Sequence, residues 1–169
     1  MNSHIFIIGM MGAGKSTIAP LLSNKLKTPC IDIDKDLVEI LNCDIVDFLK
    51  QYSEKKFRNL ESRYFLEHIK NSPAIYSTGG GIVLDKENRN ALKKTGFTIF
   101  LKASIQTLYD RIKSDINNRP LFKNKMILEQ LLNQRNSYYV DCADLVIDTD
   151  NQTPQKIVSQ IINHLNHDN

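Results

Sequence analysis

Short apolar segments alternate with longer amphipathic stretches along the chain. Apolar segments of strand length lie at residues 4–8, 30–33, 74–77, 98–101 and 145–147. Stretches with helical patterning lie near residues 15–27, 35–50, 54–70, 86–94, 104–115, 127–139 and 154–165. Alternation of this kind is typical of parallel strands joined by right-handed helical crossovers. Because no linker, repeat or low-complexity tract interrupts it, the pattern predicts a single α/β domain over residues 1–169.

The segment at residues 114–125 departs from this plan. It is polar, and Pro120 would break any helix that ran through it. A plain surface loop and an active-site lid are both open interpretations, because loops of this length often cover active sites.

The composition is that of an ordinary globular protein, with 41% hydrophobic and 24% charged residues. A net charge of +3 without a basic stripe argues against a nucleic-acid partner. The apolar runs are far shorter than the ~20 residues of a membrane span, and no signal-peptide pattern is present. The three cysteines lack C-x-x-C spacing, which favours reduced thiols. We therefore expect a cytoplasmic protein without a membrane partner.

Six of the seven glycines fall into two clusters, at residues 9–14 and 79–81. Glycine lets the backbone turn sharply or approach a ligand closely. The clustering therefore predicts two loops that belong to one site.

Residues 9–16, with the sequence GMMGAGKS, match the phosphate-binding pattern G-x-x-x-x-G-K-[ST]. They follow the first predicted strand and open the first predicted helix, as that motif requires. Lys15 is then expected to reach the β- and γ-phosphates of a nucleotide, and Ser16 to ligate Mg²⁺. A GTPase switch is disfavoured, because the chain has no D-x-x-G segment and no N-K-x-D segment.

Two carboxylates, Asp32 and Asp34, stand at the end of the second predicted strand. Residues i and i+2 on a strand share a face, so both are expected at the carboxyl edge of the sheet, where α/β proteins bind ligands. The alternative is a strand end that caps the following helix.

Arg58 and Glu61 are spaced i, i+3 on a predicted helix and can form an ion pair. A guanidinium held in this way suits bidentate binding of a substrate carboxylate, although an ordinary surface pair stays open. Arg119, beside Pro120 in the polar segment, could fold over a phosphoryl group during its transfer. Arg135 lies on the following helix, where a solvated arginine is the alternative.

These features, in this order, resemble the shikimate kinase family. The matching segments are GMMGAGKST at 9–17, D-x-D at 32–34, F-R-x-x-E at 57–61, TGGG at 78–81, RPL at 119–121, R-x-x-x-Y at 135–139 and ADLVIDTDNQTP at 143–154. The resemblance implies a P-loop NTPase fold of the nucleoside monophosphate kinase type. Such a fold has a five-stranded parallel sheet flanked by helices, with a mobile lid here at about residues 114–125.

The activity that the resemblance implies is phosphoryl transfer from ATP to the 3-hydroxyl of shikimate, on the route to chorismate and the aromatic amino acids. Its partners would be ATP and shikimate, with one Mg²⁺ ion. We expect a monomer, because nothing in the sequence demands a dimer.

The resemblance also implies roles for individual residues. Asp34, Lys15 and Arg119 would be catalytic, with Asp34 taking the proton of the reacting hydroxyl. Ser16 and Asp32 would hold Mg²⁺.

Binding roles follow from the same resemblance. Arg58 and Arg135 would clamp the carboxylate of shikimate, and Glu61 would support Arg58. The implied acceptor-binding residues are Asp34, Arg58, Glu61, Gly79, Gly80, Gly81 and Arg135. The implied ATP-binding residues are Gly12, Ala13, Gly14, Lys15, Ser16, Thr17, Arg111, Arg119, Gln152 and Pro154.

One departure from the family pattern is Ser53, which stands where a glycine often precedes F-R-x-x-E. Two other functions remain open. Another small-molecule kinase, for gluconate or a nucleoside monophosphate, would lack the combined D-x-D, F-R-x-x-E and GGG set. A non-catalytic nucleotide sensor would need no acceptor clamp.

Overall fold

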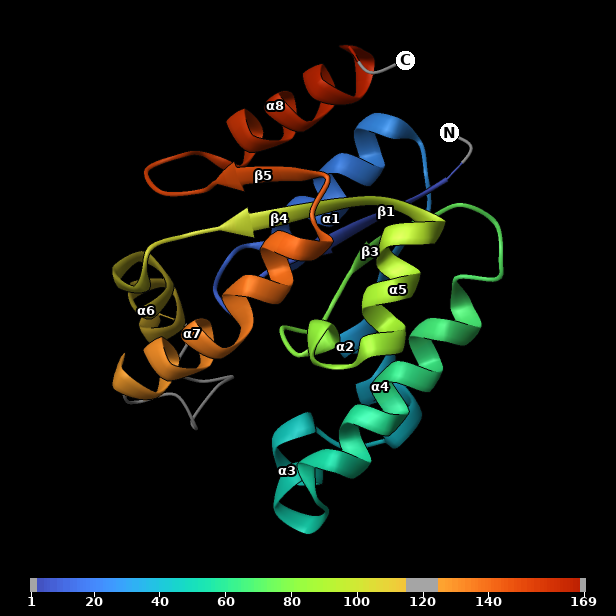
Figure 1. Ribbon diagram of the computed structural model, residues 1–169, viewed down its shortest axis with the longest axis vertical. Coiled ribbons are helices and arrows are strands. Elements are labelled where there is room, and N and C mark those ends of the chain that lie inside the picture. Colours follow the sequence, from blue (N-terminus) through green and yellow to red (C-terminus); the bar gives the residue numbers. More distant parts are fainter. Residues whose placement is uncertain (1–2, 115–124, 168–169) are drawn as a thin grey trace.

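Five parallel strands form one sheet in the described part of the chain (Figure 1). The protein is represented by a computed structural model that describes residues 3–114 and 125–167. The strands are β1 (His4–Ile8), β2 (Cys30–Asp32), β3 (Ile75–Ser77), β4 (Gly96–Lys102) and β5 (Leu145–Asp148), in the order β2-β3-β1-β4-β5. Each neighbouring pair is parallel. The predicted five-stranded parallel sheet is therefore confirmed.

Helices cover both faces of this sheet, as a parallel sheet requires. They are α1 (Lys15–Leu26), α2 (Ile33–Leu41), α3 (Ile45–Gln51), α4 (Glu54–His68), α5 (Lys86–Thr95), α6 (Ile105–Ser114), α7 (Lys125–Cys142) and α8 (Pro154–His167), with a short 3-10 helix η1 (Ile82–Leu84). Helices α1 and α8 pack together on one side of the sheet, and α5 and α7 pack together on the other (Figure 1).

The single helix predicted over residues 35–50 is wrong, because the chain forms two helices there. Helix α2 ends where Asn42 takes a left-handed backbone with φ 51°, which asparagine tolerates better than most residues. Helix α3 begins after Asp44 in extended backbone. The turn carries α3 to the end of the molecule opposite α8 (Figure 1).

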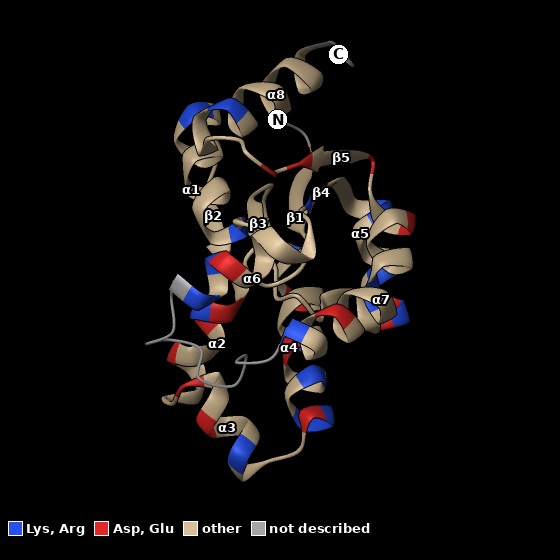
Figure 2. Cartoon of the chain, turned by 90° about the vertical axis from the view of Figure 1, so that its left-hand side faces the viewer, with Lys and Arg blue, Asp and Glu red and all other residues tan. Residues whose placement is uncertain are grey.

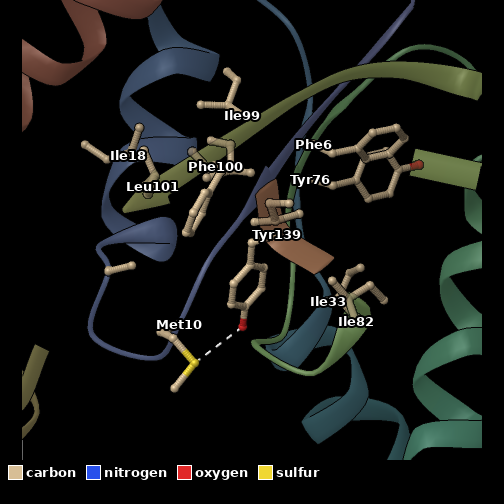
Figure 3. Packing of buried hydrophobic residues seen from close by; sticks show 14 of the residues in the cluster. Phe6, Met10, Ile18, Ile33, Tyr76, Ile82, Ile99, Phe100, Leu101 and Tyr139 are labelled. Carbon is tan, nitrogen blue, oxygen red and sulfur yellow. Dashed lines mark hydrogen bonds between the residues drawn. The ribbon is translucent and has the colours of Figure 1, made fainter. Parts of the chain in front are cut away.

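The core packs directly behind the first glycine loop. Strand β1 is buried at every position, and the ring of Phe6 lies 5.5 Å from the ring of Tyr76 on β3. On β4, the ring of Phe100 stacks on the ring of Tyr139 of α7, with centroids 5.0 Å apart. The hydroxyl of Tyr139 lies 3.5 Å from Sδ of Met10, as Figure 3 shows. The loop that leaves β1 is therefore seated on the core.

Charged side chains of both signs are interspersed along the surface helices, as Figure 2 shows for α3 and α4. Cys30, Cys43 and Cys142 are all free thiols. Among the described helices, none has both the length and the apolar character that crossing a bilayer requires.

Candidate active site

The first glycine cluster leaves β1 and turns into α1, as predicted. Gly12 and Gly14 have φ of 78° and 99°, a left-handed region that favours glycine. Gly14 is the residue before α1. The N-terminus of α1 therefore faces the loop, in the arrangement that binds phosphate groups.

Lys15 folds back over this loop. Its Nζ donates hydrogen bonds of 2.9 Å to the carbonyl oxygens of Gly9 and Met10, and the residue is only 8% exposed. Next to it, Oγ of Ser16 lies 3.4 Å from Oγ of Ser77 at the end of β3. The predicted phosphate-binding residues therefore lie at the carboxyl edge of the sheet.

The prediction that Asp32 and Asp34 share a strand face is wrong. Strand β2 ends at Asp32, and Asp34 lies in the first turn of α2. The carboxylate of Asp32 accepts a hydrogen bond of 3.4 Å from the backbone N–H of Lys35, so it caps the helix. Both side chains nevertheless line the same cavity. Strand β2 ends one residue before the predicted end at residue 33, and α2 begins at once, which explains the difference.

Arg58 lies between two carboxylates on α4. It donates to Glu61 at 2.7 Å and to Glu54 at 3.3 Å. The side chain of Glu61 is 1% exposed, so this is not an ordinary surface pair. Glu54 was missed by the sequence analysis, although its i, i+4 spacing from Arg58 could have revealed it. Ser53 caps α4 by accepting from the N–H of Lys56 at 3.3 Å.

Burial and the ion pair act in opposite directions on the pKa of both partners. Burial raises the pKa of Glu61, and the positive charge of Arg58 opposes this shift without cancelling it. Burial lowers the pKa of Arg58, but Glu61 and Glu54 outweigh it and the pKa is raised. Arg58 therefore stays charged, and Glu61 depends on it to remain ionised.

The second glycine cluster lies against these charged groups. A Cβ added at Gly79 would overlap Oε1 of Glu61 and come within 2.8 Å of Oδ1 of Asp34. A Cβ added at Gly81 would overlap the guanidinium of Arg58. A side chain at either position would therefore have to displace Glu61 or Arg58.

The two glycine clusters also meet each other, as predicted. A Cβ at Gly80 would lie 3.5 Å from the carbonyl oxygen of Gly9 and from the backbone nitrogen of Met11. The loop after β3 and the loop after β1 therefore form one continuous wall.

Arg135 of α7 is buried beside this wall, with 5% of its surface exposed. Its NH1 donates to the carbonyl oxygen of Gly80 at 3.4 Å, and its Nε has no hydrogen-bond partner among the described residues. Tyr139, one turn along, donates to the same Gly80 carbonyl. A solvated helix arginine is therefore excluded, and the role of Tyr139 in holding residue 80 was not foreseen.

Arg111 connects the phosphate-binding loop with the segment after β5. It donates to the carbonyl oxygen of Gly12 at 3.3 Å and to Thr149 at 2.8 and 3.0 Å. Gln152 donates to the carbonyl oxygen of Asp148 at 2.6 Å, while its Oε1 is buried without a described partner. Pro154 is the first residue of α8.

These segments surround one cavity of about 1160 Å³. The predicted residues on its wall are Gly12, Gly14, Lys15, Ser16, Thr17, Asp32, Asp34, Arg58, Gly79, Gly80, Gly81, Arg111 and Arg135. Ala13, Glu61, Gln152 and Pro154 are not on its described lining. The wall also includes Lys35, Val38 and Glu39 of α2 and Val46 and Lys50 of α3, which the sequence analysis missed because it treated these helices as one.

The sequence also predicted a lid that carries Arg119 and a magnesium site. Arg119 and Pro120, with most of the expected lid, lie outside the described residues. Within the described ranges, no group of three or more His, Cys, Asp or Glu is arranged to hold a metal ion. A hydroxyl and a single carboxylate, Ser16 and Asp32, fit Mg²⁺, which is commonly bound by one or two protein groups together with waters and substrate phosphates.

Comparison with known proteins identifies close relatives. The family model "SKI: Shikimate kinase" matches residues 11–166. The shikimate kinase of Enterococcus faecalis is 42% identical over 164 residues, which cover 95% of this chain and 97% of that protein.

Solved structures agree in fold. Shikimate kinase from Acinetobacter baumannii, in complex with shikimate, has a TM-score of 0.92 and 25% identity, covering 98% of this chain and 94% of that chain. A deoxyadenosine kinase from M. mycoides has a TM-score of 0.65 at 19% identity, covering 97% and 99%, and shares the fold alone.

The close approach at residue 79 generates a testable expectation. Gly79→Ala should lower the free energy of unfolding by about 1–3 kcal/mol, because Glu61 is buried and paired and has no room to move aside. Urea unfolding followed by circular dichroism measures this loss.

Gly80→Ala is the matched control for this variant. The added Cβ would make only ordinary contacts, the nearest at 3.5 Å, so the free energy of unfolding should fall by less. Equal stabilities for the two variants would contradict the close packing at residue 79.

Proposed function

Because the chain belongs to the shikimate kinase family, we propose that its cavity is where the γ-phosphate of ATP passes to the 3-hydroxyl of shikimate. The products are shikimate 3-phosphate and ADP, on the route to the aromatic amino acids. The observation that carries this assignment is that Asp34, Arg58 and Arg135 line the same cavity as Lys15. Acceptor-binding and phosphate-binding groups therefore face one space.

The nucleotide side of the cavity is the glycine loop and the N-terminus of α1. Residues 12–17 would surround the phosphates with backbone N–H groups, and Lys15 would exchange its carbonyl partners for phosphate oxygens. Arg111, Gln152 and Pro154 would border the adenine, because Arg111 already joins the loop to the segment after β5.

One Mg²⁺ ion would be held by Ser16 and, through water, by Asp32. When bound, it neutralises negative charge on the phosphate oxygens. Both residues line the same cavity as Lys15, which supports this assignment.

The acceptor side is made by Asp34, the partly exposed Arg58, the buried Arg135 and the second glycine cluster. Arg58 and Arg135 would bind the carboxylate of shikimate as planar forks, and the main chain at residues 79–81 would contact the ring. Glu61 would keep Arg58 in place from behind. Asp34 would then orient the hydroxyl and accept its proton.

Phosphoryl transfer depends mainly on positioning and charge stabilisation. In this assignment Lys15 supplies positive charge from the loop. Arg119 would supply it from the lid, which would also exclude water from the closed site. We further propose that the enzyme acts as a monomer in the cytoplasm, without nucleic-acid or membrane partners.

A kinase for gluconate or a nucleoside monophosphate is the alternative, and a panel of acceptors tests it. In a coupled assay for ADP, turnover with shikimate should exceed that with gluconate, AMP or CMP by about 10³-fold or more, because buried polar groups reject ligands that leave them unpaired. Faster turnover with another acceptor would overturn the assignment.

Asp34→Asn should lower kcat by about 10²-fold or more, the usual loss for a positioned proton acceptor, with ATP affinity unchanged. Steady-state turnover and calorimetric titration with ATP measure the two quantities. Asp141→Asn, an exposed position paired with Lys93, is the control and should keep wild-type kcat. Wild-type turnover by Asp34→Asn would remove that residue from the chemistry.

Arg58→Lys should weaken shikimate binding by about tenfold or more, because the positive charge stays while the bidentate fork is lost. Calorimetric titration with shikimate measures the dissociation constant. Arg63→Lys, an exposed position on the same helix, should leave it unchanged. An unaltered constant in Arg58→Lys would exclude carboxylate binding by Arg58.

A further inference from the structure

A hydrogen bond outside the cavity joins the two helices that carry the proposed acceptor residues. The hydroxyl of Tyr64 on α4 donates to the carboxylate of Asp36 on α2. Helix α2 carries Asp34 in its first turn, and α4 carries Arg58. Neither Tyr64 nor Asp36 is among the described residues that line the cavity.

Tyr64 is held in one orientation by its own helix. Its ring stacks on the ring of His68, with centroids 3.8 Å apart and planes inclined by 21°. The backbone carbonyl of His68 accepts from the hydroxyl of Tyr76 on β3 at 3.0 Å, which anchors this end of α4 to the sheet. The Tyr64 hydroxyl is therefore presented to α2 from a fixed support.

The chemistry of the pair suits a lasting bond. Burial raises the pKa of Tyr64, and the hydrogen bond to Asp36 raises it further. The phenol therefore remains a donor at neutral pH. Hydrogen bonds to a charged acceptor are shorter and stronger than those between neutral groups.

The separation of α2 from α4 affects how closely side chains pack around Gly79. Oδ1 of Asp34 and Oε1 of Glu61 both crowd the position of a Cβ on that residue. The apolar side chains of Leu37 and Leu60 also belong to this region of the core. Because the hydrophobic effect is non-directional, the hydrogen bond adds a directional constraint between the helices to this packing.

We propose that Tyr64 and Asp36 are a positioning pair that sets the separation of α2 from α4 and thereby aligns Asp34 with Arg58 for the acceptor. This inference rests on the proposed function, since it assigns a consequence for shikimate. It does not concern the nucleotide, whose loop lies between β1 and α1.

Tyr64→Phe tests the pair, because it removes the hydroxyl and keeps the ring. We expect kcat/KM for shikimate to fall about tenfold, as small misplacements of reacting groups can do, with KM for ATP unchanged. Tyr138→Phe is the control: it removes the hydroxyl of an exposed tyrosine on α7 whose ring packs on Arg89 and which is not among the described residues that line the cavity. It should keep wild-type constants for both substrates.

Asp36→Asn and the double variant show whether the two residues act as one unit. If they do, kcat/KM for shikimate in the double variant should be no lower than in the more impaired single variant. Losses that add, a Tyr64→Phe variant with unchanged kcat/KM for shikimate, or a KM for ATP that rises as much as KM for shikimate in Tyr64→Phe would each overturn the proposal.

The unsubstituted enzyme separates this proposal from the function on which it rests. If that enzyme did not turn over shikimate, the proposed function would fail. If it did, and Tyr64→Phe matched it, only the positioning role would fail.

Discussion

The site depends on how closely bare backbone approaches charged side chains. At Gly79 and Gly81 the main chain leaves no room for a Cβ beside Glu61 and Arg58, so the ion pair rests on peptide groups. These peptide groups directly follow β3, which is hydrogen-bonded between β2 and β1. The position of the guanidinium is therefore linked to an interior strand of the sheet, and this part of the cavity wall is attached to that strand.

The arrangement has an energetic cost that a ligand can offset. A buried carboxylate such as Glu61 costs several kcal/mol unless it is paired, and Arg58 provides the pairing. Oε1 of Glu61 and Nε of Arg135 nevertheless remain without hydrogen-bond partners among the described residues. Buried polar atoms in this state are destabilising until they are satisfied. Arg135 lines the cavity, so a ligand that carries a carboxylate could offer a hydrogen-bond acceptor on this side.

What the sequence could predict depends on how local each feature is. The phosphate-binding loop was predicted correctly because nine consecutive residues contain both its turn and its helix start. Asp32 and Asp34 were assigned to a strand because nothing in the pattern marks its end before Ile33. The break at Asn42 depends on one left-handed residue that helical patterning does not reveal. The burial of Arg135 and the bond between Tyr64 and Asp36 join segments distant in sequence, so no local pattern contains them.

The cavity therefore has two halves, one formed mainly by residues close in sequence and one formed by segments distant in sequence. The phosphate-binding part of the proposed nucleotide half is one turn between β1 and α1, which contains glycines with positive φ. The proposed acceptor half is assembled from α2, α4, the loop after β3 and α7, and its shape depends on contacts between them. Those contacts include the hydrogen bonds of Tyr139 and Arg135 to Gly80 and the bond between α4 and α2. Under the proposed function, changes to such contacts would alter acceptor binding and leave the turn after β1 intact, which ties acceptor specificity to tertiary contacts.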